Sequence, residues 1–87
     1  MSQLEKLVEQ FLREPPDVSF ADVAKVLESF GYVERPSGGG SHRAFVKPGR
    51  PPKIVPTIKG RRVKRVYVSM IVDNLNLEEW YEERRSA

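Results

Sequence analysis

Three clusters of proline and glycine divide this chain of 87 residues and limit where its helices and strands can form. They lie at residues 15–16, 36–40 and 48–52. Proline donates no backbone N–H and disfavours helical geometry in the residue before it, and glycine favours turns. The chain is therefore expected to fold as short elements separated by these three breaks.

The two segments before residue 36 have the periodicity of amphipathic helices. Ser2 and Glu5 form a capping-box pattern ahead of the first segment, and Ser19 can cap the second. The pattern predicts helices over about residues 3–13 and 20–30. Their apolar faces comprise Leu4, Leu7, Val8, Phe11 and Leu12 in the first helix and Phe20, Val23, Ala24, Leu27 and Phe30 in the second.

The middle of the chain is expected to form three strands. Residues 32–35, 42–47 and 53–58 are the extended candidates, separated by turns at residues 36–40 and 48–52. The proline within the last of these strands suits an edge strand or a bulge, because it donates no hydrogen bond to a neighbouring strand. The short connections favour an antiparallel meander.

Two further elements follow the strands. Residues 60–73 fit a strand through alternating apolar residues, and they fit a helix through apolar residues three and four positions apart. The helix is preferred because its pattern extends through more of the segment. Asn76 can cap a last short helix, with Glu78 and Glu79 in its first turn, Arg84 and Arg85 at its end, and Trp80 and Tyr81 as anchors.

This order of elements predicts an α+β fold. A chain of this length has room for about one hydrophobic core, so residues 1–87 are expected to form a single domain. Residues 1–17 are expected to be an N-terminal helical extension, and residues 18–87 the core of the domain. The expected architecture is a three-stranded antiparallel sheet with the helices packed on one face.

The composition excludes several kinds of chemistry. The chain has no cysteine and one histidine, so it offers no disulfide, no thiolate zinc site, no cysteine nucleophile and no multi-histidine metal site. The central segment has no carboxylate cluster for magnesium, and neither a metal nor another cofactor is expected. Apolar runs are too short to cross a membrane and no signal-peptide pattern is present, so a cytoplasmic protein without membrane contact is expected.

Positive charge is concentrated in the middle of the chain. The formal net charge is +3, but residues 36–65 contain no acidic residue, while both flanking regions have more acids than bases. A polyanion is therefore the expected partner. The nine basic residues of this segment, called the basic block below, are Arg43, Lys47, Arg50, Lys53, Lys59, Arg61, Arg62, Lys64 and Arg65.

Part of the basic block lies where helix stability alone would not place cations. If residues 60–73 are helical, the first turns of that helix carry four cations, and the macrodipole disfavours each by roughly 0.3–1 kcal/mol. These residues are Arg61, Arg62, Lys64 and Arg65. A helix N-terminus that carries arginine suits a phosphate group. The hypothesis is that this helix start contacts phosphate.

His42 is the candidate for catalysis. Histidine is the side-chain type that changes charge near neutral pH, and His42 is the single histidine of the chain. If Phe45 faces the helices, strand alternation places His42 on the open face of the sheet. Nearby cations favour the neutral form that a general base needs. Ser41 is not expected to pair with His42 as a nucleophile, because neighbouring strand residues point to opposite faces.

Several of these features together resemble the HicA family, small mRNA interferases of bacterial and archaeal toxin–antitoxin systems. The resemblance covers roughly residues 18–82. It includes the helix with Leu27 that ends in Phe30-Gly31-Tyr32, then Gly40-Ser41-His42-Arg43-Ala44-Phe45, a strand with proline, and a basic segment at the start of a helix. The Gly-Ser-His-x-x-Phe core is its most specific element. The extra helix at residues 3–13 and the long run Gly38-Gly39-Gly40 depart from the family pattern.

The resemblance implies a fold like that of double-stranded-RNA-binding domains and cleavage of RNA without a metal. It implies His42 as the catalytic residue and a HicB-like antitoxin as protein partner. The residues expected to contact RNA are Ser41, Arg43, Lys47, Lys53, Lys59, Arg61, Arg62, Lys64 and Arg65, beside the loop of Gly38, Gly39 and Gly40. Two alternatives remain: a non-catalytic RNA-binding module that uses the same basic block, and a protein whose basic surface binds an acidic protein partner.

Overall fold

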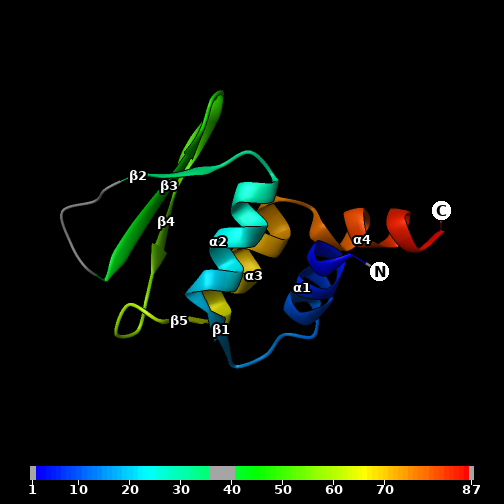
Figure 1. Ribbon diagram of the computed structural model, residues 1–87, viewed down its shortest axis with the longest axis horizontal. Coiled ribbons are helices and arrows are strands. Elements are labelled where there is room, and N and C mark those ends of the chain that lie inside the picture. Colours follow the sequence, from blue (N-terminus) through cyan, green and yellow to red (C-terminus); the bar gives the residue numbers. More distant parts are fainter. Residues whose placement is uncertain (1, 36–40, 87) are drawn as a thin grey trace.

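The computed structural model describes residues 2–35 and 41–86 and has four helices and five strands within them (Figure 1). The helices are α1 (Gln3–Leu12), α2 (Phe20–Ser29), α3 (Arg65–Asn74) and α4 (Leu77–Ser86). The strands are β1 (Asp17–Ser19), β2 (Val33–Arg35), β3 (His42–Lys47), β4 (Arg50–Pro56) and β5 (Arg62–Lys64). This order confirms the predicted α+β class.

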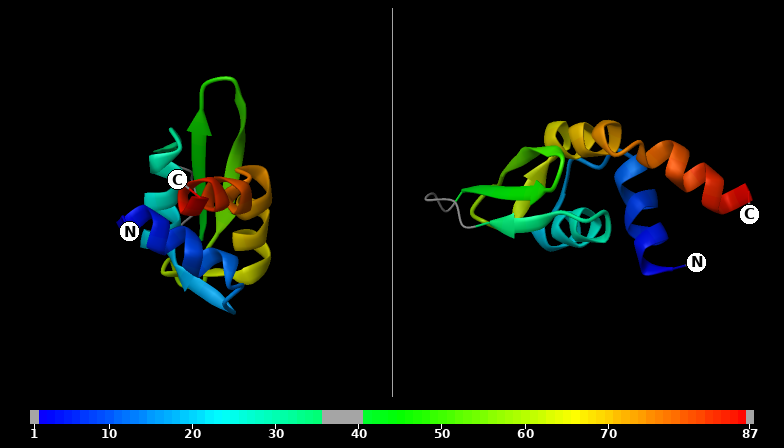
Figure 2. Two further views of the ribbon diagram at one scale, coloured as in Figure 1. Left: turned by 90° about the vertical axis from the view of Figure 1, so that its right-hand side faces the viewer. Right: turned by 90° about the horizontal axis from the view of Figure 1, so that it is seen from above.

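The main sheet is antiparallel, with the strand order β2-β3-β4. Helices α2 and α3 lie on the same side of it, whereas α1 and α4 lie further from the sheet, at the end of the molecule where both termini are found (Figure 2). No described element covers the other side of the sheet. The three-stranded sheet with helices on one face is therefore as predicted.

The hydrophobic core lies between this sheet and the helices. Phe45 of β3 is fully buried, and its ring centroid is 5.9 Å from that of Phe20 at the start of α2. Val55 of β4 is buried on the same face of the sheet. The helices contribute Val8, Phe11, Val23, Val26, Leu27, Val68 and Ile71 to the same buried cluster. The predicted apolar faces of the first two helices are thus the faces that pack inward.

A second sheet of two strands was not predicted. β1 and β5 pair antiparallel, and Val18 and Val63 lie opposite each other in the register with both side chains fully buried. The prediction of one helix over residues 60–73 is therefore wrong for residues 62–64, and α3 begins at Arg65. The local sequence allows both structures, and burial of Val63 against a valine far away in the chain favours the strand.

Strand β4 begins three residues earlier than predicted. The turn between β3 and β4 consists of Pro48 and Gly49 alone, and Gly49 has φ 77°, a left-handed conformation that suits glycine. The prediction of a turn over residues 48–52 is wrong at its end, because Pro51 and Pro52 belong to the strand. Strand β4 is at the edge of the sheet, where proline is tolerated since no second neighbour needs its N–H.

Helix α1 packs against helix α4. The capping box of α1 is present: the Ser2 Oγ accepts from the Glu5 N–H at 3.1 Å, and the Ser2 N–H donates to the Glu5 carboxylate at 3.2 Å, which lowers the pKa of Glu5. The Tyr81 hydroxyl of α4 donates to the Glu9 carboxylate of α1, which raises the pKa of Tyr81. The predicted acidic first turn and basic last turn of the last helix are confirmed. No helix of the described chain has the length and apolar character to cross a membrane.

Candidate functional site

His42 lies on the side of the main sheet that faces away from the helices. Phe45 points into the core, so the alternation of β3 directs His42 and Ala44 to the opposite side, and His42 is exposed, as predicted. His42 is the first residue of β3 and lies opposite Pro56, the last residue of β4. The imidazole is therefore at the end of the sheet furthest from the Pro48-Gly49 turn.

Ser41 contacts His42, contrary to the prediction from strand alternation. The Ser41 Oγ lies 3.3 Å from the His42 Nδ1. Ser41 belongs to the turn before β3 rather than to the strand, so strand alternation does not govern its side chain. If the hydroxyl accepts from an Nδ1–H, the lone pair is on Nε2. The contact is suited to setting the tautomer and orientation of the ring.

Thr57 holds Ser41 in this position. The Thr57 N–H donates to the Ser41 carbonyl oxygen at 2.6 Å, and the Thr57 hydroxyl donates to the same oxygen at 3.1 Å. These two bonds continue the β3–β4 pairing by one residue pair beyond His42 and Pro56. The backbone on both sides of the imidazole is thus attached to the sheet.

Two residues near His42 were not identified from the sequence. Thr57 is one of them, and Arg35 is the other: Arg35 lies opposite Ala44, exposed, on the face of the sheet that carries His42. Glu34 faces the helices instead, which confirms the orientation of Arg35. Alternation in residues 32–35 could have placed Arg35 on one face, but the register of β2 against β3 was needed to bring it near His42.

Arg43 is directed away from His42 and toward α2. Its guanidinium lies 4.4 Å from the centroid of the Phe20 ring, and its Nε donates to a carboxylate oxygen of Glu34. Both partners are on the helix side of the sheet. Arg43 thus forms a partly buried ion pair that holds β2, β3 and α2 together, and it does not lie beside the imidazole.

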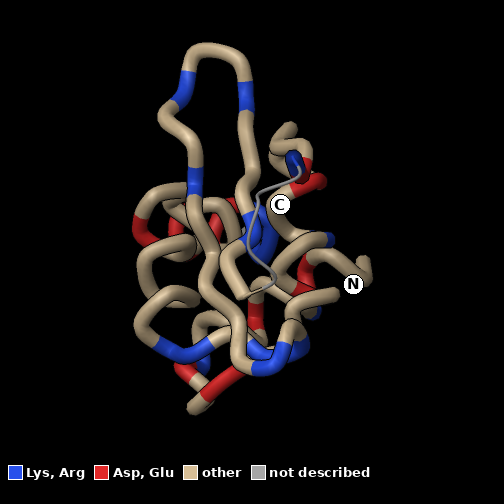
Figure 3. The backbone as a smooth tube through the Cα atoms, turned by 90° about the vertical axis from the view of Figure 1, so that its left-hand side faces the viewer, with Lys and Arg blue, Asp and Glu red and all other residues tan. Residues whose placement is uncertain are grey.

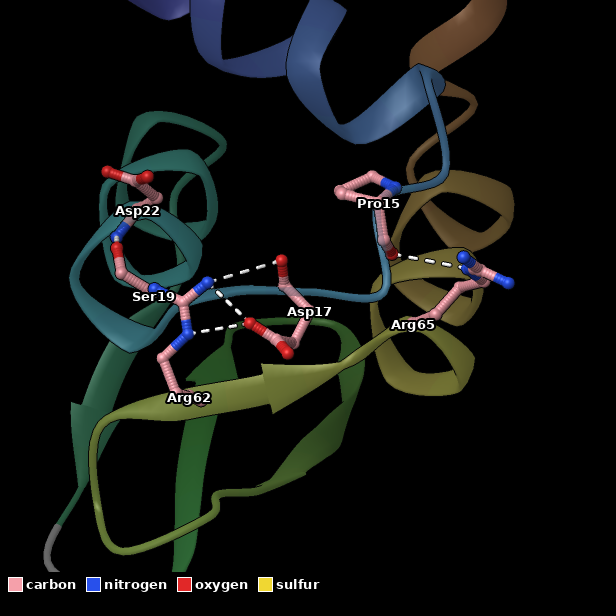
Figure 4. A network of polar contacts seen from close by, with 6 residues as sticks. All are labelled: Pro15, Asp17, Ser19, Asp22, Arg62 and Arg65. Carbon is pink, nitrogen blue, oxygen red and sulfur yellow. Dashed lines mark hydrogen bonds and ion pairs between the residues drawn. The ribbon is translucent and has the colours of Figure 1, made fainter.

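The hypothesis of a phosphate site at a basic helix start is wrong in its geometry. Only Arg65 belongs to α3; Arg61, Arg62 and Lys64 precede it. Two of the four cations have local partners, which Figure 4 shows. The Arg62 Nε donates to an Asp17 carboxylate oxygen at 2.7 Å, and the Arg65 Nε donates to the Pro15 carbonyl at 3.2 Å. Each of these two arginines therefore has a stabilising contact within the fold, whereas the hypothesis had assumed that neither has one.

We expect the Arg62 and Asp17 pair to contribute to stability. Replacing Arg62 with alanine removes an ion pair that is about half exposed and a further bond to the Asp17 carbonyl. The expected loss in the free energy of unfolding is about 1 kcal/mol, measured by urea denaturation. The matched control is Arg61→Ala, which removes a neighbouring exposed arginine and should change the value by less than about 0.5 kcal/mol. Equal effects of the two substitutions would contradict this role of Arg62.

The remaining cations of the basic block form two groups at opposite ends of the main sheet. Lys47, Arg50 and Lys53 are on the β3–β4 hairpin, and Lys47 is about 17 Å along β3 from His42, at roughly 3.4 Å per residue. Lys59 and Arg61 are exposed on the turn after β4, at the end near His42, and Lys64 is exposed at the end of β5. Figure 3 shows basic positions on both strands of the hairpin and others at the opposite end of the sheet. The two groups therefore cannot contact one phosphate together.

Lys59 and Arg61 are on the turn between β4 and β5, which follows the strand that pairs with His42. The backbone of this turn is fixed, because the Ile58 N–H donates to the Arg62 carbonyl at 2.7 Å and the Phe20 N–H donates to the Arg61 carbonyl at 2.7 Å. Within the described residues, the side chains of Lys59 and Arg61 form no ion pair. They are available to an anion that approaches the His42 end of the sheet.

Parts of the predicted site lie outside the description or do not form. Gly38, Gly39 and Gly40 lie outside the described residues. Over the described ranges, no three His, Cys, Asp or Glu side chains gather as a possible metal site. Comparisons of the chain with protein-family models, curated proteins and solved structures found no match. The argument for function therefore depends on the residues around His42.

Proposed function

We propose that this chain is a HicA-like, cytoplasmic endoribonuclease that cleaves mRNA without a metal, with His42 as general acid and base, on a fold like that of double-stranded-RNA-binding domains. The observation that carries the proposal is the placement of His42. Its ring is exposed at the end of the open sheet face, and the Ser41 Oγ lies 3.3 Å from Nδ1. The resemblance in residues 18–82 supports the same residue.

The proposed reaction is attack by the RNA's own 2′-hydroxyl on the adjacent phosphorus. His42, through the ring nitrogen that does not contact Ser41, accepts the 2′-hydroxyl proton as the bond from O2′ to phosphorus forms. The bond from phosphorus to O5′ breaks, and a proton from solvent or from the imidazolium neutralises the leaving oxygen. The products are a 2′,3′-cyclic phosphate and a new 5′-hydroxyl end.

Cations at the same end of the sheet are suited to the charge that develops on the phosphate. Lys59 and Arg61 are on the turn that begins at Ile58, two residues after the partner of His42 in the sheet. Arg35 lies on the same face, opposite Ala44, which is two residues along β3 from His42. Positively charged groups placed before the reaction stabilise the phosphorane more than the substrate, and this lowers the barrier.

The proposal is tested by incubating the purified chain with a labelled single-stranded mRNA fragment in excess EDTA. We expect cleavage to continue, with products that carry a 2′,3′-cyclic phosphate and a 5′-hydroxyl, identified by mass spectrometry. A salt-sensitive gel shift with intact RNA would contradict the enzyme and favour the non-catalytic RNA-binding module. Loss of cleavage in EDTA that magnesium restores would contradict the metal-independent reaction.

The same proposal includes a HicB-like antitoxin that covers His42. Support for a protein partner on this side comes from the apolar side chains of the open sheet face. Val33 and Ile54 are 57% and 56% exposed, and their register positions put them on the face that carries His42. Large apolar side chains left exposed together are typical of an interaction surface. A partner bound there would block access to the imidazole.

A further inference from the structure

A groove of about 310 Å³ lies between the edge strand β4 and helix α3, on the side of the sheet opposite to His42. Its walls include Arg50, Lys53 and Ile54 from the strand and Tyr67, Met70 and Asn74 from the helix. Lys53 is three residues from Pro56, the partner of His42, or about 10 Å along β4. The groove is therefore near His42 but cannot hold the phosphate that reacts there.

Positive charge converges at this groove without a carboxylate to balance it. The ammonium groups of Lys47 and Lys53 lie 5.7 and 5.4 Å from the centroid of the same ring, that of Tyr32, which forms part of the wall. Arg50 adds a third cation. Within the described residues none of the three forms an ion pair. Like charges held close together repel, and a bound anion relieves this repulsion.

The helix side of the groove offers a different kind of contact. Met70 of α3 is 54% exposed and lines the groove, whereas Ile54 contributes to the rim from the edge strand and directs its side chain to the open face. Tyr67 supplies an aromatic ring, and Asn74 at the end of α3 supplies an amide that can both donate and accept. Apolar and aromatic side chains beside an amide suit an unpaired nucleobase, whose faces stack and whose edge forms hydrogen bonds.

An extended peptide strand fits this edge less well. The Thr57 N–H donates to the Ser41 carbonyl, so alternate residues Val55 and Lys53 direct their backbone groups to β3. Ile54 then directs its N–H outward, while Pro52 and Pro56 on either side have none to offer. A peptide that added a strand here would gain few backbone hydrogen bonds.

We propose that this groove is a second RNA contact. It binds an unpaired nucleotide of the RNA that is cleaved at His42, with the base against α3 and the phosphate at Arg50 and Lys53. The proposal rests on the proposed function, since it assigns single-stranded RNA as the substrate class. In this proposal the RNA leaves the open face of the sheet at His42, passes the edge of the sheet at β4 and enters the groove. Cleavage at His42 then depends on nucleotides on one side of the cut.

The test measures binding in the His42→Ala chain, which keeps the groove and does not cut the probe. The probe is a fluorescein-labelled single-stranded RNA of ten nucleotides, and its Kd is measured by anisotropy over a range of salt. Replacing both Arg50 and Lys53 with glutamine is expected to weaken binding and to lower the slope of log Kd against log salt by about 0.7, the contribution of the one single-strand phosphate contact that the two residues share.

A double variant of Lys6 and Lys25 to glutamine is the matched control, because it removes two exposed cations from α1 and α2. It should change the slope much less. Asn74→Ala should leave the slope unchanged and reduce the difference in Kd between probes that differ in one base. Equal slopes in the groove and control variants would overturn the proposal. So would equal binding of a duplex probe, or displacement of the probe by an oligoglutamate of the same charge.

Failure of the groove and failure of the proposed function give different results. If the chain with His42 does not cleave RNA but the groove variants still lose affinity, the activity is wrong and the groove stands. If the chain cleaves RNA and the groove variants bind the probe as the control does, the groove alone is wrong. In an active chain, the groove variants should cleave a dinucleotide at the unchanged rate and a ten-nucleotide RNA with a raised KM.

Discussion

Replacing His42 with alanine is expected to lower the rate of RNA cleavage by about 10²–10⁴-fold, the usual contribution of a positioned general acid or base. The side chain is exposed and lies at the end of a strand, so its removal takes nothing from the core. The free energy of unfolding and the affinity for RNA should therefore remain close to those of the unchanged chain. Single-turnover cleavage, urea denaturation and anisotropy measure the three quantities.

Ser41→Ala is the companion variant, because it removes the contact to Nδ1 and keeps the imidazole. A positioning role predicts a smaller loss of rate than His42→Ala together with an altered dependence of the rate on pH, since the tautomer and orientation of the ring are less well defined. Thr57 still holds the backbone of residue 41 in this variant. Cleavage at an unchanged rate by the His42→Ala chain would remove the imidazole from the mechanism.

Replacing Phe45 with alanine is expected to have the largest effect on stability. The ring is fully buried between the sheet and α2, and truncation of a buried phenylalanine costs about 3–5 kcal/mol. A domain of this size has a total stability on the order of 4–13 kcal/mol, so the variant should lose a large part of it or fail to fold. Urea denaturation followed by circular dichroism measures the change.

Val33→Ala is the control for this prediction. Val33 is 57% exposed on the open face of the same sheet, so its truncation should change the free energy of unfolding by less than about 0.5 kcal/mol. A similar loss in both variants would contradict the assignment of the two faces. The Val33→Ala variant is also useful for measuring partner binding on the open face, because the substitution is expected to leave the fold intact.

Much of the fold follows from local pattern in the sequence. Both N-terminal helices, the capping box of Ser2 and Glu5 and the three strands of the main sheet form close to their predicted positions. Apolar spacing and caps act over a few residues, so these elements are specified within each segment. The face of β3 that carries His42 was also predictable, because Phe45 is the large apolar residue of the strand and alternation settles the rest.

The basic block was a weaker guide to the site. In the sequence its nine cations form one acid-free segment, but in the fold Arg43 pairs with Glu34, Arg62 pairs with Asp17 and Arg65 binds the Pro15 carbonyl. Arg62 and Asp17 are 45 residues apart, so no local pattern indicates that they meet. The sequence also does not show that the ammonium groups of Lys47 and Lys53 lie over the Tyr32 ring. This contact depends on how the β3–β4 hairpin packs against the segment between α2 and β2.

The sequence by itself determined the α+β class, the two N-terminal helices, the main sheet and the side of β3 that carries His42. The tertiary structure alone decided that residues 62–64 pair with residues 17–19, that Ser41 contacts His42, and which cations remain available to an anion. The physical reason is the range of the interactions. Periodicity, caps and turns act between near neighbours, whereas strand pairing and ion pairs join residues that only the fold brings together.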